Sequence, residues 1–231
     1  MSVYTPQFAP LVVLAFLGTV GLLILCAFLV LVGALRKSRS TVLGGVGAGA
    51  IILVGYTSVL LGLSLASRDI EITPGAWKYF CELDCHIAYA IGGMHVVTSV
   101  GPEMQSVSAN ARFAIVQIKT WFDPATISPQ RGDGPLTPNR RAITLVDDRA
   151  RKFVPSAKGD PVLAAARLHS TPLHTSLRPG ESYVSYVVFE IPEDATGLKL
   201  LLTSSDAESV LLWGDENSPL HSKAYFVLPR T

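Results

Sequence analysis

Two long apolar runs dominate the first part of the chain. They extend over residues 11–35 and residues 42–66, and each exceeds the roughly 20 apolar residues that a helix needs to cross a membrane. A loop over residues 36–41 separates them. It carries all the charges between positions 11 and 67, namely Arg36, Lys37 and Arg39. The pattern predicts a hairpin of two transmembrane helices.

The charges of the loop also predict the orientation of this hairpin. Loops rich in Lys and Arg stay in the cytoplasm, so we expect residues 36–41 on the inner side of a cytoplasmic membrane. Residues 1–10 and everything from residue 67 onward then lie on the periplasmic or extracellular side. A signal peptide is the competing interpretation, but residues 1–10 carry no positive charge and the first apolar run is too long.

Glycine is frequent in the second apolar run, where Gly45 and Gly49 form a GxxxG pair. Small residues at this spacing let two helices approach closely in lipid. Two interpretations stay open: the glycines pack the second helix against the first, or they form a surface that docks another membrane subunit. The further glycines of this run are Gly44, Gly47, Gly55 and Gly62.

A different pattern begins near residue 109. Leu198, Leu200 and Leu202 alternate with other residues, which is typical of a half-buried strand. Turn residues separate the strand candidates, which are residues 111–122, 141–147, 151–155, 182–191, 197–203 and 223–228. The pattern predicts an all-β sandwich over residues 109–231, joined to the hairpin by a connector over residues 67–108. Residues 162–169 fit either a helical turn or an edge strand.

Two motifs of this region resemble a widespread bacterial family of exported or membrane-anchored domains of unknown function. Residues 177–192 (LRPGESYVSYVVFEIP) are similar to the family's L-x-P-G-E turn and the strand that follows it. Residues 145–153 (LVDDRARKF) are similar to its D-x-x-G-x-x-Y/F hairpin, with Ala150 in place of the glycine. The resemblance covers residues 109–229 and implies an immunoglobulin-like sandwich. It implies no catalytic residues.

Cys81 and Cys85 are candidates for a disulfide, because a domain outside the cytoplasm faces an oxidising compartment. On a helix or helical turn, residues four apart face the same way with Cα atoms about 6 Å apart, which a disulfide can bridge. Along one strand they are about 13 Å apart and cannot pair. Cys26, inside the first apolar run, is expected to be a small apolar filler.

A copper site is the alternative for the same segment. Thiolate, imidazole and thioether groups are soft ligands that suit copper, so Cys81, Cys85 and His86, with Met94 or His95, are the candidate ligands. A free redox dithiol is a further alternative. Because a disulfide is favoured over both, no cofactor is expected.

The anchor-plus-sandwich architecture also resembles subunit II of respiratory oxidases, which binds two coppers through C-x3-C-x3-H-x2-M and an upstream histidine. Cys81-x3-Cys85 matches this motif, but Tyr89 and Gly92 occupy the next two ligand positions. Covalent haem is disfavoured, because Cys81-x3-Cys85-His86 is one residue longer than the usual C-x2-C-H attachment motif.

Composition supports a membrane protein and argues against several functions. The 231 residues are 49% hydrophobic and 16% charged, whereas about a quarter of an ordinary soluble domain is charged. A net charge of +1 without a basic patch disfavours a nucleic-acid partner. The sequence shows no nucleophile elbow and no phosphate-binding glycine loop, and it indicates no small-molecule substrate.

The sequence therefore predicts a non-enzymatic accessory or interaction subunit. Its partners are expected to be the lipid bilayer and the subunits of a larger membrane complex, such as a respiratory or photosynthetic assembly. Trp77, Tyr79 and Phe80 are expected near the membrane interface, where aromatic rings are favoured. The sequence assigns neither an oligomeric state nor a role to the other histidines, His169, His174 and His221.

Overall fold

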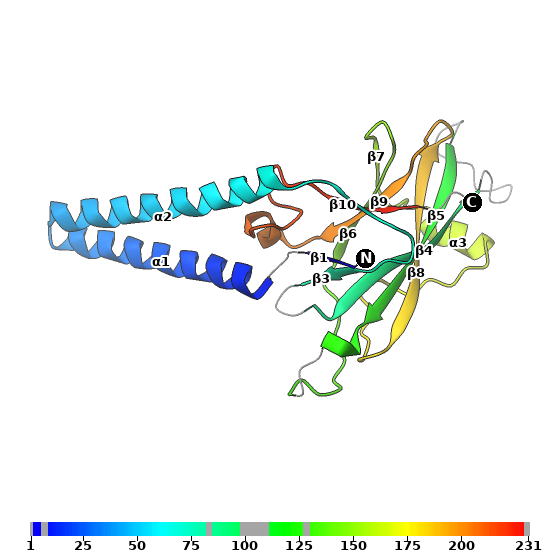
Figure 1. The fold of residues 1–231 in the computed structure, drawn as a ribbon, viewed down its shortest axis with the longest axis horizontal. Coiled ribbons are helices and arrows are strands. Elements are labelled where there is room, and N and C mark those ends of the chain that lie inside the picture. The colour runs from blue at the N-terminus through cyan, green and yellow to red at the C-terminus, as the bar shows by residue number, and fades with distance from the viewer. Residues whose placement is uncertain (1, 6–8, 82–84, 98–110, 127–129, 229–231) are drawn as a thin grey trace. The chain divides into compact units, whose positions relative to one another are not determined.

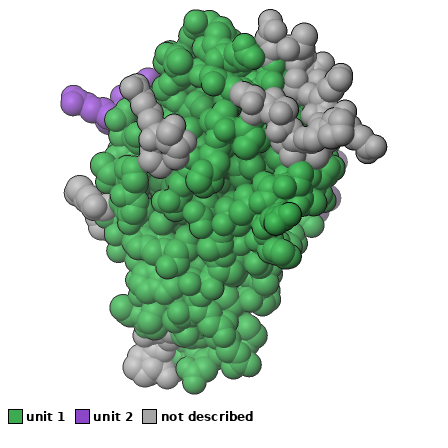
Figure 2. All heavy atoms as spheres, turned by 90° about the vertical axis from the view of Figure 1, so that its right-hand side faces the viewer, with its two compact units in different colours: residues 1–5, 69–206, 223–231 green, residues 6–68, 207–222 purple. Residues whose placement is uncertain are grey.

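The computed structural model describes residues 2–5, 9–81, 85–97, 111–126 and 130–228. The chain forms two compact units. Unit 1 consists of residues 1–5, 69–206 and 223–231, and unit 2 consists of residues 6–68 and 207–222. Figure 2 shows unit 1 as one continuous body, although three separate stretches of the chain build it.

Unit 2 contains an antiparallel pair of long helices (Figure 1). They are α1, Ala9–Leu35, and α2, Arg39–Ala66. Both are long and apolar enough to cross a membrane, with mean hydropathies of 2.8 and 2.0 in the two spans. The chain reverses between them, where Lys37 has a positive φ of 53° and the N–H of Ser38 donates to the carbonyl of Gly33. The two predicted helices are confirmed, with α2 beginning three residues earlier.

Unit 1 contains two five-stranded sheets in its described residues. The first has the order β1-β3-β4-β5-β8, and the second has the order β2-β10-β9-β6-β7. The strands of the first sheet are β1 Val3–Thr5, β3 Lys78–Phe80, β4 Ile87–Val97, β5 Ala111–Phe122 and β8 Ser182–Pro192. The strands of the second sheet are β2 Ile70–Ile72, β6 Arg141–Val146, β7 Lys152–Phe153, β9 Lys199–Ser204 and β10 Ala224–Val227.

One hydrophobic core joins the two sheets, which makes unit 1 a β-sandwich. Val116 and Ile118 of β5 face this core from the first sheet, and Leu200 and Leu202 of β9 face it from the second. The opposite face of β5, which carries Phe113 and Ile115, packs against the short helix α3, Gly159–Ala165. β5 is therefore covered on both faces, because successive side chains of a strand point to opposite sides.

The strands after residue 109 follow the predicted alternation, and the six candidates there correspond to β5–β10. The segment 162–169 overlaps α3 and so contains part of a helix. The predicted connector over residues 67–108, however, contains β2, β3 and β4. Residues 1–10 likewise contain β1, which pairs in parallel with β3, while β2 pairs in parallel with β10. β1, β2 and β3 have three residues each and show no measurable period. β4 has 11 residues, but its first five are all buried, so it lacks the alternation of a half-buried strand.

The two family-like motifs form tight turns with backbone in the left-handed region. Ala150, at the motif's glycine position, has a φ of +59°, and Gly180 of the L-x-P-G-E turn has a φ of +83°. Asp147 holds the first turn, because its carboxylate accepts hydrogen bonds from the backbone N–H groups of Arg149 and Arg151. Positive φ favours glycine, so Ala150 departs from the motif at the position where the departure costs most.

Candidate functional site

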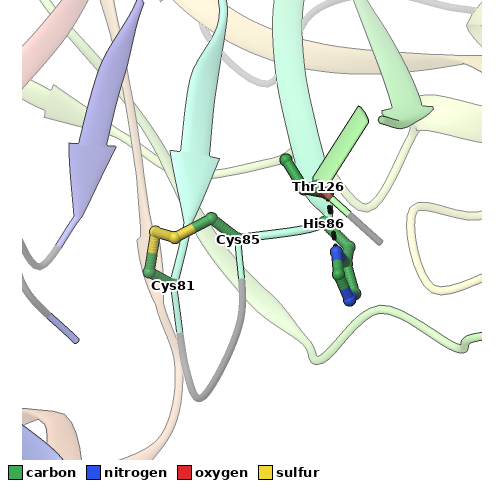
Figure 3. The surroundings of a disulfide bond; sticks show 4 residues. All are labelled: Cys81, Cys85, His86 and Thr126. Carbon is green, nitrogen blue, oxygen red and sulfur yellow. Dashed lines mark hydrogen bonds between the residues drawn. A yellow bond between two sulfur atoms is a disulfide. The ribbon is translucent and has the colours of Figure 1, made fainter. Parts of the chain in front are cut away.

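A disulfide between Cys81 and Cys85 joins the end of β3 to the start of β4 (Figure 3). The two strands are antiparallel, and their last pair is Phe80 with Ile87, so the cysteines lie just beyond this pair. Their Cα atoms are 4.2 Å apart. The predicted disulfide is thus present, but two facing strands bring the cysteines together, a geometry that spacing along one strand or helix does not anticipate. Residues 82–84 lie outside the described residues.

His86 follows the disulfide, but its side chain points away from the sulfur atoms (Figure 3). His86 is 3% exposed, and its Nδ1 forms a hydrogen bond of 2.6 Å with the hydroxyl of Thr126. The ring also stacks on Phe122, with centroids 5.3 Å apart. His86 therefore links β4 to the end of β5, and this packing accounts for its burial.

A tyrosine–carboxylate pair lies next to the disulfide on the same sheet. The hydroxyl of Tyr79 on β3 donates to Asp123 Oδ2 at 2.8 Å, and Asp123 Oδ1 accepts from the N–H of Ala125. Burial, followed by the hydrogen bond to Asp123, raises the pKa of Tyr79 well above its usual value of 10.0. The phenol is thus held protonated as a donor. No sequence pattern signals this pair, because its members are distant along the chain.

The aromatic residues expected near the membrane interface belong largely to the sandwich. Tyr79 and Phe80 are each 5% exposed, so the expectation is wrong for these two. Phe80 packs edge-on against Tyr89 in the core, and Trp77 packs against Trp121 of β5. Successive side chains of the run Trp77–Phe80, which includes β3, point to opposite faces of the sheet. Cys81 of the disulfide follows this run directly.

The candidate copper ligands do not gather in the described part of the chain. No group of three or more His, Cys, Asp or Glu residues there has the geometry to hold a metal ion. Met94 and His95 lie far along β4 from His86, because a strand rises about 3.3 Å per residue. The sulfur atoms of Cys81 and Cys85 are bonded to each other, so the disulfide would have to be reduced before they could ligate copper as thiolates.

The remaining histidines lie outside this cluster. His169 and His174 are exposed in the segment between α3 and β8. His221 is half-buried, and its Nδ1 bonds to the carbonyl of Ser222.

The disulfide can undergo one chemical step of its own: two electrons and two protons convert it to a dithiol. Cys81 is buried and Cys85 is partly exposed.

Unit 1 also contains a cavity that the sequence analysis did not foresee. Its volume is about 530 Å³, and its lining includes Met94 and Ile191 from the first sheet and Leu198, which directly precedes β9. Arg112 and Lys199 line it as well. Arg112 donates to the backbone carbonyl of Glu193, which directs part of its guanidinium toward the protein.

The glycines of α2 divide into two groups. A Cβ added to Gly45 would lie 2.9 Å from Val30 Cγ2, and one added to Gly49 would lie 3.6 Å from Cys26 Cβ. This GxxxG pair therefore packs against α1. A Cβ added to Gly44, Gly47, Gly55 or Gly62 would have no neighbour within 4 Å.

Comparisons with known proteins return solved structures of low sequence identity. No family model matches the chain, and no curated protein matches it. The similar solved structures include a conserved hypothetical protein from Bacillus anthracis, with 12% identity, a TM-score of 0.37, and coverage of 51% of this chain and 82% of that one.

Two further structures cover more of the chain. The yjhA protein of Bacillus subtilis has 12% identity and a TM-score of 0.38, over 68% of this chain and 98% of that one. An uncharacterized beta-sandwich protein of Clostridium difficile 630 has 9% identity and a TM-score of 0.38, over 71% of this chain and 96% of that one. Likeness at this level bears on neither activity nor partner.

Proposed function

We propose that the protein is a non-enzymatic accessory subunit that is anchored in a cytoplasmic membrane by α1 and α2. Its sandwich, of the immunoglobulin-like type, lies on the outer side and docks on a larger membrane complex, such as a respiratory or photosynthetic assembly. The left-handed turn at Ala150 supports the immunoglobulin-like type, because the resembling family has glycine there. The loop charges support the orientation.

The exposure of the helices supports a membrane anchor. Leu11, Ile24 and Ile51 are 65–75% exposed. Neither residues 9–35 nor residues 40–67 contain a charged residue. Burial of such side chains in a bilayer contributes roughly 1.5–3 kcal/mol each relative to water. A surface of this kind is stable in lipid and would aggregate in water.

The connectivity supports two crossings. β1 precedes the hairpin and β2 follows it, yet both belong to unit 1. β1 pairs with β3 and β2 pairs with β10, so both ends of the hairpin lead into the same folded domain. A chain that leaves a domain and returns to it crosses the membrane an even number of times.

The open glycine face of α2 is the observation that carries the docking proposal. Gly55 and Gly62 follow Gly44 by about three and five full helical turns, so the three glycines lie in one line along the helix. This line is turned by roughly 100–140° from Gly45 and Gly49, the pair that contacts α1. The open face therefore lets a second helix approach α2 closely without disturbing the hairpin.

Blue-native electrophoresis of membranes from the source cell, extracted with a mild detergent, tests this proposal. We expect the chain to migrate in a complex much larger than its own 24.7 kDa. The variant Gly55→Leu/Gly62→Leu places bulk on the open face and should release the lone chain. Val46→Leu adds one methylene group at an exposed position away from that face and should leave the complex intact. A wild-type chain that always migrates alone contradicts the proposal.

A further inference from the structure

A segment near the C-terminus belongs to the helical unit rather than to the sandwich. Residues 207–222 follow the last residues of β9, include the short 3-10 helix η2, Ala207–Leu211, and precede β10. They cluster with α1 and α2 in unit 2. We call residues 207–222 the returning segment.

Two sets of contacts hold the returning segment along α2. At one end, the hydroxyl of Tyr56 donates to the carbonyl of Leu211 at 2.7 Å, and the ring of Tyr56 packs against Trp213 with centroids 4.9 Å apart. At the other end, the N–H of Ser222 donates to the hydroxyl of Ser67 at 2.8 Å. The segment therefore runs beside the last three turns of α2.

The returning segment buries several polar residues and exposes several apolar ones, although Glu208 is also exposed. Four polar residues are 5% exposed or less, namely Ser209, Asp215, Glu216 and Ser218. By contrast, Val210, Leu211 and Leu220 are exposed by 41%, 48% and 71%. In water this arrangement is unfavourable, because large apolar side chains prefer burial.

Internal hydrogen bonds pair several backbone groups of the segment and part of its buried polar groups. The hydroxyl of Ser218 donates to the carbonyl of Leu212, and the side-chain amide of Asn217 donates to the hydroxyl of Ser209. The N–H groups of Leu212 and Asp215 also donate within the segment. Irregular backbone can enter a lipid environment only when its polar groups are paired in this way.

The position along α2 defines the depth of the segment. Arg39 marks the cytoplasmic boundary, and a rise of 1.5 Å per residue places Tyr56 about 25 Å and Ser67 about 42 Å from it for an untilted helix. The hydrocarbon core is about 30 Å thick. Trp213, held at Tyr56, then lies just inside the outer boundary, which is where Trp and Tyr side chains concentrate in membrane proteins.

We infer that the returning segment is a lipid-binding element whose η2 end inserts into the outer leaflet, with Val210 and Leu211 in contact with acyl chains and Trp213 at the interface. The inference rests on the proposed membrane anchor. Acyl chains are the occupant that fits, because Val210 and Leu211, the large exposed side chains of η2, are aliphatic. Glu208 of the same turn is exposed as well and has to reach the headgroup region. Because Ser209, Asp215, Glu216 and Ser218 are buried inside the segment, it does not turn these polar side chains toward lipid.

Depth-dependent quenching of tryptophan fluorescence tests the inference. The full-length variant Trp77→Phe/Trp121→Phe retains Trp213 alone of the chain's three tryptophans. It is reconstituted in phosphatidylcholine vesicles brominated at C6–C7 or at C11–C12 of one acyl chain. We expect the shallow bromines to remove about half of the emission or more, the deep bromines less, and aqueous acrylamide little. If the double variant does not fold, the difference between wild type and Trp213→Phe gives the same signal.

A second tryptophan position separates this inference from the anchor itself. Leu53→Trp, made in a chain with all three native tryptophans changed to Phe, places an indole on an exposed position of α2. Quenching of Trp at position 53 by deep bromines without quenching of Trp213 by either lipid retains the anchor and overturns the inference. Absence of lipid quenching at both positions overturns the anchor. Protection of Trp213 from both lipid and acrylamide assigns the segment to a protein partner and also overturns the inference.

Discussion

The helical hairpin and the sandwich use the same apolar side chains in opposite ways. Leu200 and Leu202 of β9 are 0% exposed, whereas Leu43 and Leu65 of α2 are each 71% exposed. The sandwich gains stability by removing leucine from water. The hairpin cannot do so within its own fold, and under the proposed membrane anchoring its solvent is lipid.

Packing differs between the two regions as well. Large side chains such as Phe122 and Phe189 fill the interior of the sandwich. In the hairpin, close approach depends on the absence of a side chain, as at Gly45, where an added Cβ would meet Val30. Lipid supplies no hydrophobic force between helices, so backbone contact at small residues takes its place.

Leucine-to-alanine substitutions sharpen this comparison most strongly. We expect Leu200→Ala to lower the free energy of unfolding of the sandwich by about 2–5 kcal/mol, because a fully buried side chain leaves a cavity. Leu53→Ala on the hairpin should change it by less than about 0.5 kcal/mol. Urea unfolding in mild detergent, followed by tryptophan fluorescence, measures both. Equal effects would remove the distinction between the regions.

The cysteines provide a second contrast. Replacing both Cys81 and Cys85 by alanine should lower the stability of the sandwich by about 2 kcal/mol, as expected for a very short disulfide loop. Cys26→Ala, in α1, is the matched control and should have little effect on the same transition. Unchanged stability of the double variant would show that the disulfide does not stabilise the pair of strands β3 and β4.

The left-handed turn in the sandwich predicts a stabilising substitution. Ala150→Gly should raise the free energy of unfolding by about 1 kcal/mol, because glycine adopts a positive φ without steric cost. Ala142→Gly, at an exposed position of β6, should instead lower it by about 0.5–1 kcal/mol. The same urea titration distinguishes the two, and a loss of stability in both variants would contradict the assigned backbone conformation.

The same turn predicts a pH dependence for the sandwich. Burial tends to raise the pKa of Asp147, but hydrogen bonds from Arg151 outweigh it and hold the pKa below its ordinary value of 3.8. The stabilisation is therefore complete above the unfolded value and is lost as the pH falls through the lower folded value. Asp147→Asn should flatten the acid limb of a stability-against-pH curve. An identical acid limb in both proteins would exclude this origin.

The sequence predicted the features that depend on long periodic patterns or on local charge. Residues 11–35 and 42–66 indicate their helices, and Leu198, Leu200 and Leu202 indicate β9. The alternation of the strand at 111–122 similarly locates β5.

Apart from the largely buried strand β4, the features that the sequence missed depend on contacts between distant segments. β1 and β2 have three residues each, and their parallel partners lie more than 70 and 150 residues away. Tyr56 meets Trp213 across a similar separation. The disulfide was foreseen as chemistry, yet its position between two strands was not, because β3 also has only three residues. Such contacts leave no local pattern.

Labelling with a membrane-impermeant maleimide tests the central claim most directly. In a chain without native cysteines, Ser38→Cys probes the loop between the helices and His169→Cys probes an exposed position of the sandwich. The account predicts that position 169 reacts in intact spheroplasts, whereas position 38 reacts only in inverted membrane vesicles. Labelling of position 169 from the cytoplasmic side alone would contradict it.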